Sequence, residues 1–539
     1  MRTIAQFAAC IASGIMLALA YPRLGIWPLA WVALVPWLLM VFTARWPVAI
    51  LGSWLAGFAF FSSLMYWIAI FGYLPWALLA LIESLAFVAT AVVTRFLFRV
   101  PGVLPASASD ASSGPTAWRI LLVGFAWVTW EHLRSLGALG VPWGQVGHSQ
   151  APFLALAQLA AFGGVPAISF VVVVFNAAVA HAIATRRRGI RSLAPIVCAA
   201  GLVVISVAAG AVHARRVERA LGLDRSRPVR VAIAQPSLKT WLTVEQLNVP
   251  VTQEQQDYEL AAYAGLTREA AARGAQVVIW PESAVPGYIN CEGQVRRAVA
   301  SLARELHIWL VVGGPAFETG PGAPLTGLEY NSAYLISPQG NISDRYDKVH
   351  LVPFGEYVPW RKWIPLLSHY RVRETDVTPG AQYRVLRAGG ISLGPMICFE
   401  SVVPHISRRE AIRSAGALVI ITNDAWFLRT AAAAQHLQIG RFRAIEEGMY
   451  VARGAATGIS AFIDPRGRLM DSLGMMKRGV ILADIRPRRA DTLYYRIGPV
   501  FSLACLAAVC VWIVAAGMKR LRTRRMARQS SPAAASAKG

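Results

Sequence analysis

The stretch Gly394-Pro-Met-Ile-Cys-Phe-Glu-Ser401 indicates most clearly how the polar part of this chain folds. An apolar, strand-like run leads to Cys398 at a turn, and a carboxylate, Glu400, follows two residues later. A lone cysteine is more often a buried structural residue than a reactive one. Cys398 gains significance because two stretches upstream have the same design.

Both upstream stretches place an ionisable side chain where a predicted strand ends. In Val277-Val-Ile-Trp-Pro-Glu-Ser283, the apolar run stops at a proline and Glu282. In Tyr346-Asp-Lys-Val-His-Leu-Val-Pro-Phe-Gly-Glu-Tyr357, Lys348 precedes a loop rich in proline and glycine. Rigid elements position functional groups, and loops give access to them. We therefore interpret Glu282 as a base, Lys348 as an electrostatic stabiliser and Cys398 as a nucleophile.

The region around these stretches, roughly residues 222–490, alternates between strand-like and helix-like segments. We expect strands at 229–235, 276–280, 308–314, 331–337, 392–397, 417–422, 450–455, 459–463 and 480–485, and helices at 253–273, 292–306 and 434–447. The turn Pro338-Gln-Gly-Asn341 predicts a hairpin that leads into the lysine stretch. This alternation predicts a layered α/β domain with a mixed sheet, and two sheets between helix layers fit it.

The composition of the whole chain indicates a membrane protein. Of its 539 residues 55% are hydrophobic and only 15% are charged. Segments of about 20 apolar residues can cross a bilayer. We expect eight spans, at 4–20, 25–44, 48–70, 74–95, 117–136, 155–184, 192–212 and 498–518. The net charge is +24, and the runs of basic residues lie beside these spans. This pattern favours a role of the charges in membrane topology over nucleic-acid binding.

The positive charges predict the orientation of the chain. With the N-terminus in the cytoplasm, basic residues gather on one side of the membrane, at Arg45, Arg95, Arg99, Arg186–Arg188 and Lys519–Arg528. We therefore expect a membrane domain over 1–215, a polar domain over 222–490 outside the inner face of the membrane, a last span at 498–518 and a basic cytoplasmic tail at 519–539. Ala18-Leu-Ala20 resembles a signal-peptidase site, but an uncleaved first span fits the charges better.

Polar residues inside the membrane half are expected to have protein or water partners, because a lipid-facing charge is costly. Glu83 lies mid-span, and Glu131 and Arg134 lie three residues apart, as a mutual ion pair at a helix end would require. The turn Gly140-Val-Pro-Trp-Gly-Gln145 is expected to place Trp143 at the level of the lipid headgroups.

The three candidate residues together suit acyl transfer through a thioester. A thiol is mostly protonated at neutral pH and needs a base or a positive neighbour to react. Glu282 can take its proton, and Lys348 can favour the thiolate and then stabilise the oxyanion, as can the backbone N–H after Cys398. Glu356 and Glu400 can orient the lysine or relay a proton, although each can also be a surface or helix-capping carboxylate.

No cofactor or metal is expected. Of the six cysteines only Cys291 and Cys398 fall in the polar region, and their spacing fits neither a disulfide framework nor a zinc site. His350 and His436 have no second histidine at a ligand spacing, which favours structural roles.

Several phrases resemble the signatures of a known family. They are Trp280-Pro-Glu-Ser283, Lys348-Val-His-Leu-Val-Pro-Phe-Gly-Glu-Tyr-Val-Pro359, Ile397-Cys-Phe-Glu-Ser401, Thr422-Asn-Asp-Ala-Trp-Phe427 and Gly140-Val-Pro-Trp143. The first three resemble the Glu-Lys-Cys triad of the nitrilase, or carbon–nitrogen hydrolase, superfamily. All five together are similar to the apolipoprotein N-acyltransferase family of bacterial inner-membrane enzymes, and the resemblance covers nearly the whole chain.

This resemblance implies a fold, a reaction and a set of site residues. The polar domain would be an αββα sandwich, and Glu282, Lys348 and Cys398 would be catalytic. Supporting residues would be Glu356, Phe399, Glu400 and, by a looser match, Trp241. The acyl donor would be a phospholipid, typically phosphatidylethanolamine, and the acceptor a diacylated lipoprotein. Nothing in the sequence demands more than a monomer.

The chain departs from the family's pattern at a few positions. Phe399 stands where many relatives have tyrosine, residues 428–434 form an altered loop, and Met449 and Ala456 replace a usual arginine and asparagine. These changes affect the expected fit of the substrate rather than the triad. The alternatives are a paralogue that acylates another amine, a membrane-anchored amidase, or a catalytically idle scaffold. Few intramembrane charges argue against a transporter.

Overall fold

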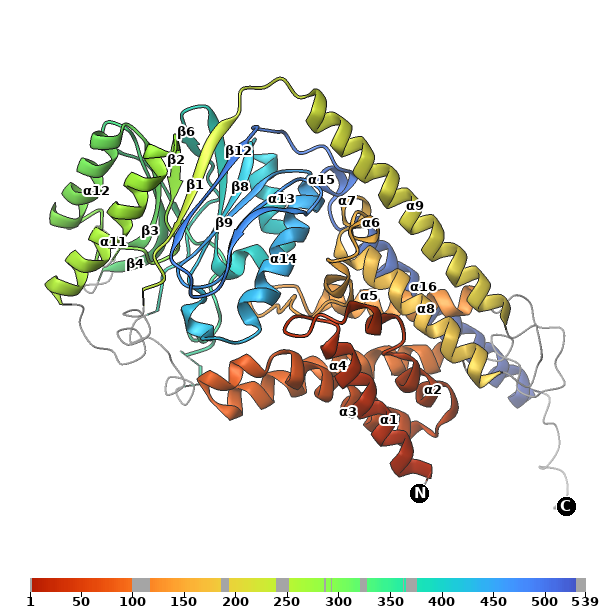
Figure 1. The fold of residues 1–539 in the computed structure, drawn as a ribbon. Coiled ribbons are helices and arrows are strands. Elements are labelled where there is room, and N and C mark those ends of the chain that lie inside the picture. The colour runs from red at the N-terminus through yellow and green to blue at the C-terminus, as the bar shows by residue number, and fades with distance from the viewer. Residues whose placement is uncertain are drawn as a thin grey trace, which may run out of the picture.

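The computed structural model describes residues 2–98, 117–185, 193–238, 252–285, 287–291, 293–319, 327–361, 363–364 and 376–529. The described chain forms a helical region, built from both ends of the sequence, and an α/β region between them (Figure 1). The predicted fold class is confirmed.

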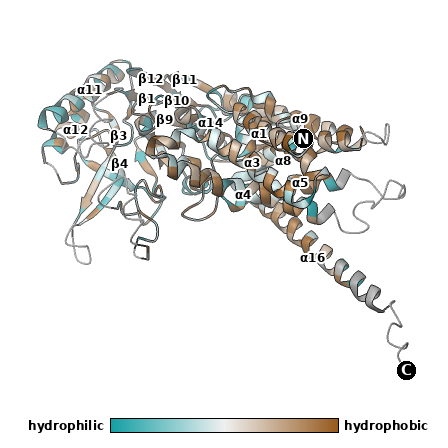
Figure 2. Ribbon diagram, turned by 90° about the horizontal axis from the view of Figure 1, so that it is seen from below, coloured by the Kyte–Doolittle hydropathy of each residue, from teal (hydrophilic) through white to brown (hydrophobic). Residues whose placement is uncertain are grey.

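The helical region contains eight longer helices and several short ones. The longer helices are α1 (Arg2–Leu19), α2 (Val35–Thr43), α3 (Trp46–Leu64), α4 (Tyr73–Phe98), α5 (Ala117–Leu133), α8 (Val165–Ala184), α9 (Ala194–Leu223) and α16 (Val500–Gln529). The short ones are η1 (Trp27–Trp31), η2 (Tyr66–Phe71), η3 (Val146–Gln150), α6 (Leu154–Ala157), α7 (Ala160–Gly163) and α15 (Leu493–Ile497). Among the described residues, five helices are long and apolar enough to cross a membrane: α3, α4, α8, α9 and α16. Figure 2 shows hydrophobic residues along these helices.

Prolines and a glycine break two of the predicted spans. The segment expected at 25–44 consists of η1 and α2, each with a proline in its first turn. Proline lacks the N–H that a continuous helix needs, so it is tolerated only at a helix start. The segment expected at 155–184 is interrupted at Gly164, whose φ of 71° ends α7 before α8 begins. The number of membrane crossings stays a prediction.

The α/β region contains two six-stranded mixed sheets. The strands are β1 (Val229–Gln235), β2 (Val277–Ile279), β3 (Trp309–Glu318), β4 (Leu328–Ile336), β5 (Ile342–Asp347), β6 (Leu386–Ala388), β7 (Ile391–Ile397), β8 (Ala417–Thr422), β9 (Val451–Ala455), β10 (Ser460–Ile463), β11 (Leu469–Leu473) and β12 (Gly479–Ile485). One sheet has the order β12-β1-β2-β3-β4-β5, and the other has the order β11-β10-β9-β8-β7-β6. The predicted mixed sheet and the predicted β4–β5 hairpin are confirmed.

The two sheets repeat one pairing pattern. In the first, β1, β2 and β3 are parallel neighbours, and β12, β4 and β5 are added antiparallel. In the second, β7, β8 and β9 are parallel, and β6, β10 and β11 are added antiparallel. The α/β region therefore consists of two halves of similar topology, with short strands β6 and β11 that the sequence pattern did not indicate.

Two helices cover the outer face of each sheet. They are α11 (Gln253–Ala272) and α12 (Gly293–Leu306) on the first sheet, and α13 (Pro404–Ile412), which the sequence pattern missed, and α14 (Ala432–Glu447) on the second. Apolar side chains from both sheets meet in a core between them, including Ile233, Ile279 and Ile421. The order of layers is thus helix, sheet, sheet, helix. Helix α14 lies between its sheet and the helical region, whereas α11 and α12 lie at the far side (Figure 1).

Glu83, Glu131 and Arg134 of the helical region all have protein partners, although not the expected ones. Arg134 Nη1 lies 2.9 Å from the Glu83 carboxylate rather than pairing with Glu131. Glu131 instead accepts hydrogen bonds from the Trp127 indole at 2.8 Å and from the Val146 N–H at 2.7 Å. The predicted Glu131–Arg134 ion pair is therefore wrong, because a helix-packing partner and a loop N–H satisfy the two groups separately. The expectation that Glu83 faces protein is confirmed.

Candidate active site

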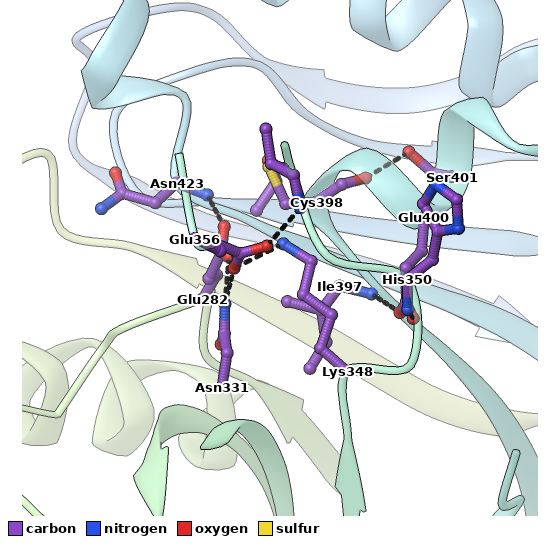
Figure 3. Close-up of polar contacts among 12 residues, drawn as sticks. Glu282, Asn331, Lys348, His350, Glu356, Ile397, Cys398, Glu400, Ser401 and Asn423 are labelled. Carbon is purple, nitrogen blue, oxygen red and sulfur yellow. Dashed lines mark hydrogen bonds and ion pairs between the residues drawn. The ribbon is translucent and has the colours of Figure 1, made fainter. Parts of the chain in front are cut away.

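The structure brings Glu282, Lys348 and Cys398 together between the two sheets. Glu282 follows β2, Lys348 follows β5, and Cys398 is the first residue after β7, at the start of the 3₁₀-helix η6 (Cys398–Val402). Their side chains converge in Figure 3. All three strand ends that the sequence singled out therefore meet at one place.

Strand β2 and its neighbours hold Glu282 rigidly. Trp280, which precedes the turn, is buried, stacks on Tyr263 with 4.6 Å between ring centroids, and donates a 2.9 Å hydrogen bond to Thr267. Gly313 on β3 lies so close that a Cβ there would collide with the Pro281 carbonyl. Only glycine allows the strand to approach the turn so closely. The carboxylate is thus fixed by its backbone.

Lys348 is a buried cation between two carboxylates. Its Nζ lies 2.9 Å from Glu356 Oε1 and 3.7 Å from Glu282 Oε1. Burial favours the neutral amine, but the Glu356 and Glu282 carboxylates outweigh it and raise the pKa of Lys348. Burial likewise opposes ionisation of Glu356, and Lys348 outweighs it, so that the pKa of Glu356 is lowered. The site therefore keeps a permanent positive charge beside the thiol.

Two asparagines complete the carboxylate cluster, and sequence reasoning missed both. The Asn331 amide donates to Glu282 Oε1 at 2.8 Å and to Glu356 Oε1 at 2.9 Å (Figure 3). The backbone N–H of Asn423 donates to Glu282 Oε2 at 2.7 Å. Asn331 lies inside β4, and in the predicted strand 331–337 it stands at the start rather than at the carboxyl end, so the pattern that located the triad could not identify it. Asn423 belongs to a phrase that the family resemblance had marked without a role.

Cys398 sits on a strained turn. Its φ of 52° lies in the left-handed region, which residues with a Cβ rarely adopt. Its carbonyl accepts a 2.8 Å hydrogen bond from the Ser401 hydroxyl and lies 3.2 Å from His436 Nε2. Strain of this kind persists only where surrounding contacts hold it. The turn presents the sulfur at the end of β7 and is held from the opposite side by Ser401 and His436.

The thiol is protonated in the resting site. Burial and the Glu282 carboxylate raise the pKa of Cys398, and Lys348 lowers it by less. The expectation that Lys348 favours the thiolate is correct in direction, but burial is the larger effect. A thiol in this state needs a nearby base before it can react as a nucleophile, and the Glu282 carboxylate lies close enough to raise the pKa of Cys398.

Glu400 ties the lysine loop to the cysteine turn. Its Oε1 accepts from the Tyr346 hydroxyl and from the Val349 and His350 N–H groups at 2.8–3.0 Å. Its Oε2 accepts from Ile397 N at 2.8 Å, which caps η6. Burial raises the pKa of Glu400. The capping interpretation is therefore confirmed, the surface interpretation is wrong because the side chain is fully buried, and the residue positions Lys348 against Cys398.

The remaining supporting candidates differ in outcome. The Phe399 ring stacks on His350 at 5.9 Å and packs against the core of the helical region. Phe399 thus joins the turn at Cys398 to the helical region. Trp241 lies outside the described residues. Within the described part of the chain, no three His, Cys, Asp or Glu side chains are grouped so that they could hold a metal ion.

Comparisons with known proteins identify the family of this chain. A family model described as carbon-nitrogen hydrolase matches residues 230–495, and one described as apolipoprotein N-acyltransferase N-terminal domain matches residues 13–178. An apolipoprotein N-acyltransferase of Geobacter metallireducens is 33% identical over 516 residues, which cover 94% of each chain. The chain belongs to the apolipoprotein N-acyltransferase family.

Other relatives extend the comparison. An apolipoprotein N-acyltransferase of Azotobacter vinelandii is 30% identical over 92% of both chains. Among solved structures, an amidase from Nesterenkonia sp. is 21% identical, with a TM-score of 0.36 over 52% of this chain and 96% of the amidase. Saccharomyces cerevisiae Nit3, a nitrilase-superfamily member, is 20% identical, with a TM-score of 0.37 over 48% of this chain and 91% of its own. As a member of the family with five apolar helices, this chain is a membrane protein.

Proposed function

We propose that this apolipoprotein N-acyltransferase family member moves a fatty acyl chain from a phospholipid, such as phosphatidylethanolamine, to the α-amino group of the diacylglyceryl-cysteine that begins a lipoprotein. Lipoprotein N-acylation follows from its membership of the family. The acyl donor and the covalent route are our proposal. The observation that carries the route is the buried cluster of Glu282, Lys348 and Cys398 beside the helical region.

The first half-reaction makes a thioester. The Cys398 sulfur attacks the ester carbonyl carbon of the phospholipid while Glu282 takes the thiol proton. The oxyanion forms beside the Lys348 ammonium, whose charge is fixed by the neighbouring carboxylates. The ester C–O bond then breaks, and Glu282 returns the proton to the departing oxygen of the lysophospholipid. The acyl chain remains on the sulfur.

The second half-reaction makes an amide. The neutral α-amine of the acceptor attacks the thioester carbonyl, and Glu282 takes a proton from the nitrogen. Collapse of this intermediate breaks the C–S bond, and the proton returns to the sulfur. All three groups come from one chain, which supports activity as a monomer.

The placement of the domain in the cell is also part of the proposal. The basic residues predict that the α/β region lies on the periplasmic side of a bacterial inner membrane, with several spans anchoring it. Trp360 and Trp363, in the loop after Glu356, are 56% and 84% exposed, as side chains at a membrane surface would be. Such a position suits a donor whose ester bond lies near the headgroup level.

Intact mass spectrometry tests the route. The purified protein is incubated in detergent with phosphatidylethanolamine, beside Cys398→Ala and the control Cys291→Ala, which lacks another thiol of the α/β region. We expect wild type and Cys291→Ala to gain one acyl chain, and Cys398→Ala to gain none. Absence of an adduct on wild type under every condition would contradict the cysteine mechanism.

A further inference from the structure

Gln435 on α14 enters the helical region and uses every hydrogen-bonding position of its amide there. Its Oε1 accepts from the indole N–H of Trp143 at 2.8 Å and of Trp67 at 3.3 Å. Its Nε2 donates to the carbonyls of Pro22 at 2.8 Å and Leu64 at 3.1 Å. These four partners lie just after α1, at the end of α3, within η2 and in the loop before η3. A single side chain of the α/β region thus joins four separate segments of the helical region.

The next residue of the same helix contacts the cysteine turn. His436 Nε2 lies 2.8 Å from Ser401 Oγ and 3.2 Å from the Cys398 carbonyl oxygen. On its other edge, His436 Nδ1 lies 3.2 Å from Asp424 Oδ1. Two adjacent residues of α14 therefore contact different parts of the molecule. Gln435 contacts the helical region, and His436 contacts the strained turn that carries the nucleophile.

Aromatic packing links the same two structures a second time. The Trp143 ring lies 5.8 Å from the His436 ring, and the Trp67 ring lies 4.7 Å from that of Phe427. Phe427 ends the short helix η7 (Asp424–Phe427), which directly follows the Asn423 N–H that holds Glu282. Trp143 is 3% exposed and its N–H is directed to Gln435, so its side chain contacts protein rather than lipid. Its expected level at the lipid headgroups stays a prediction.

From these contacts we infer that Gln435, with its indole donors Trp143 and Trp67, is a positioning element that sets the cysteine turn against the membrane segments. The inference rests on the proposed function and adds to it: the element makes the triad productive toward an acyl ester that is held in a bilayer. A soluble acyl ester needs only the triad, whereas a bilayer-held ester also needs the turn at a fixed place relative to the membrane helices.

The physical reason is geometric. A displacement of about 1 Å at a reacting centre can cost on the order of 100-fold in rate. A buried amide whose four hydrogen bonds are made fixes its position strongly, because a shift leaves polar groups unpaired at about 1–3 kcal/mol each. Gln435 is 3% exposed, so water cannot replace those partners. A variant without the amide loses the fixed position but keeps the triad residues.

The test compares two acyl donors on one cysteine. Thioester formation at Cys398 is timed by mass spectrometry, with phosphatidylethanolamine in nanodiscs and with water-soluble p-nitrophenyl butyrate. For Gln435→Leu we expect a loss of about 10- to 100-fold with the phospholipid and less than about threefold with the soluble ester. The loss is expected in kcat rather than KM, because binding of the phospholipid to the enzyme is unchanged.

Two further variants separate positioning from loss of structure. Trp143→Phe removes only one N–H donor to Gln435 and keeps an aromatic ring, so we expect the same selective loss, about 3- to 10-fold. Gln438→Leu is the matched control. Gln438 lies one turn along α14 and donates to the His148 carbonyl at 2.7 Å, a contact with the helical region that does not adjoin the cysteine turn. We expect it to slow neither reaction by more than about threefold.

The outcomes are distinct. Equal losses with both donors in Gln435→Leu, no loss with either, or an equal selective loss in Gln438→Leu would overturn the inference. If wild type reacts with the soluble ester but never with phospholipid, the proposed function fails. Amide hydrogen exchange then tests whether Gln435 positions the cysteine turn. In that case Gln435→Leu must raise exchange in both 62–71 and 398–403, and unchanged exchange in either segment overturns the inference.

Discussion

Helices α12 and α14 occupy equivalent places in the two halves of the α/β region, yet their surroundings differ. Helix α12 connects β2 to β3, and α14 connects β8 to β9. Only five of the fourteen residues of α12 are buried, whereas fourteen of the sixteen residues of α14 are. The outer face of α12 meets water, while the corresponding face of α14 meets the helical region. One topological unit therefore serves as a surface layer in one half and as an interface in the other.

This difference indicates how the reaction is divided between the halves. The first half supplies Glu282 and Lys348 from a sheet whose outer helices lie away from the membrane helices (Figure 1). The second half supplies Cys398 from the sheet that packs, through α14, on the helical region. In the proposed mechanism, the nucleophile that must meet the lipid carbonyl is thus attached to the half that packs on the helical region. The base and the cation are brought to it across the sandwich.

The largest expected effect is on catalysis, where the two halves meet. Glu282→Gln keeps the shape of the side chain but removes the base, so we expect acylation of Cys398 to fall by about 10²- to 10⁴-fold. Glu269→Gln is the control, because Glu269 pairs with Arg273 on the exposed face of α11. Mass-spectrometric timing of the acyl adduct measures both. Near-normal acylation of Glu282→Gln would show that Glu282 is not the base. The proposed division, with the base in the first half and the nucleophile in the second, would then be wrong.

The next effect is on stability and contrasts buried with exposed ion pairs. Arg453 Nη2 lies 2.7 Å from Asp424 Oδ2 in the second half, and both side chains are fully buried. Arg453→Met leaves the carboxylate without its cation, so we expect a loss of about 3–5 kcal/mol, seen as a fall in Tm of about 10 °C. A Tm within about 2 °C of wild type would show that the second half tolerates an unpaired buried charge.

The dependence of stability on pH should also differ between the halves. Burial and the nearby Glu400 raise the pKa of Glu410, on α13, to about 9. The folded protein therefore keeps this proton at pH values where the unfolded chain has released it. Stability from Glu410 is complete below about pH 4.5 and declines as pH rises toward 9. We expect Glu410→Gln to reduce the fall in Tm between pH 5 and pH 9, as differential scanning fluorimetry would measure.

The control for this pH series is Glu305→Gln on α12. Arg268 lowers the pKa of Glu305, so its contribution is lost only as pH falls below the ordinary range of a glutamate. The Tm profile of Glu305→Gln between pH 5 and pH 9 should match that of wild type. A Glu410→Gln profile as steep as that of wild type would contradict the assignment.

The smallest effect is expected for the exposed pair that bridges α11 and α12. Arg268 Nε lies 2.8 Å from Glu305 Oε1, with both side chains about half exposed. Solvent screens such pairs, so Arg268→Ala should lower the Tm by less than about 2 °C. A loss as large as that of Arg453→Met would mean that the two outer layers do not differ as described.

The sequence was sufficient to locate the three residues of the candidate triad, because each of them lies at a strand end. Apolar runs with proline or glycine stops mark the strand ends before Glu282 and Cys398. Lys348 is marked instead by the hairpin turn at 338–341 and by the proline- and glycine-rich loop that follows it. Asn331 could not be identified in this way, because it lies inside β4 and acts only through two carboxylates that come from other elements. Its role follows from the tertiary fold.

The membrane side was less predictable for the same reason. Arg134 was expected to pair with Glu131 from local spacing, but α4 supplies Glu83 from 51 residues away. Trp143 was expected at headgroup level, and nothing in its own segment indicated that Gln435 would accept its N–H. The polar residues of α14 gave the available signal: a helix that carries buried Gln435, His436 and Gln438 needs partners on more than one face. Periodicity predicts the helix but not those partners.

The most direct test of thioester-mediated transfer is a chase of the isolated acyl-enzyme. Wild-type protein is loaded from phosphatidylethanolamine, freed of phospholipid, and mixed with a diacylated lipopeptide that has a free α-amine or with the same peptide N-acetylated. We predict that only the free amine discharges the adduct rapidly, with one N-acylated peptide formed per enzyme. An adduct that is lost to water at the same rate with either peptide, or that persists with both, would contradict the account.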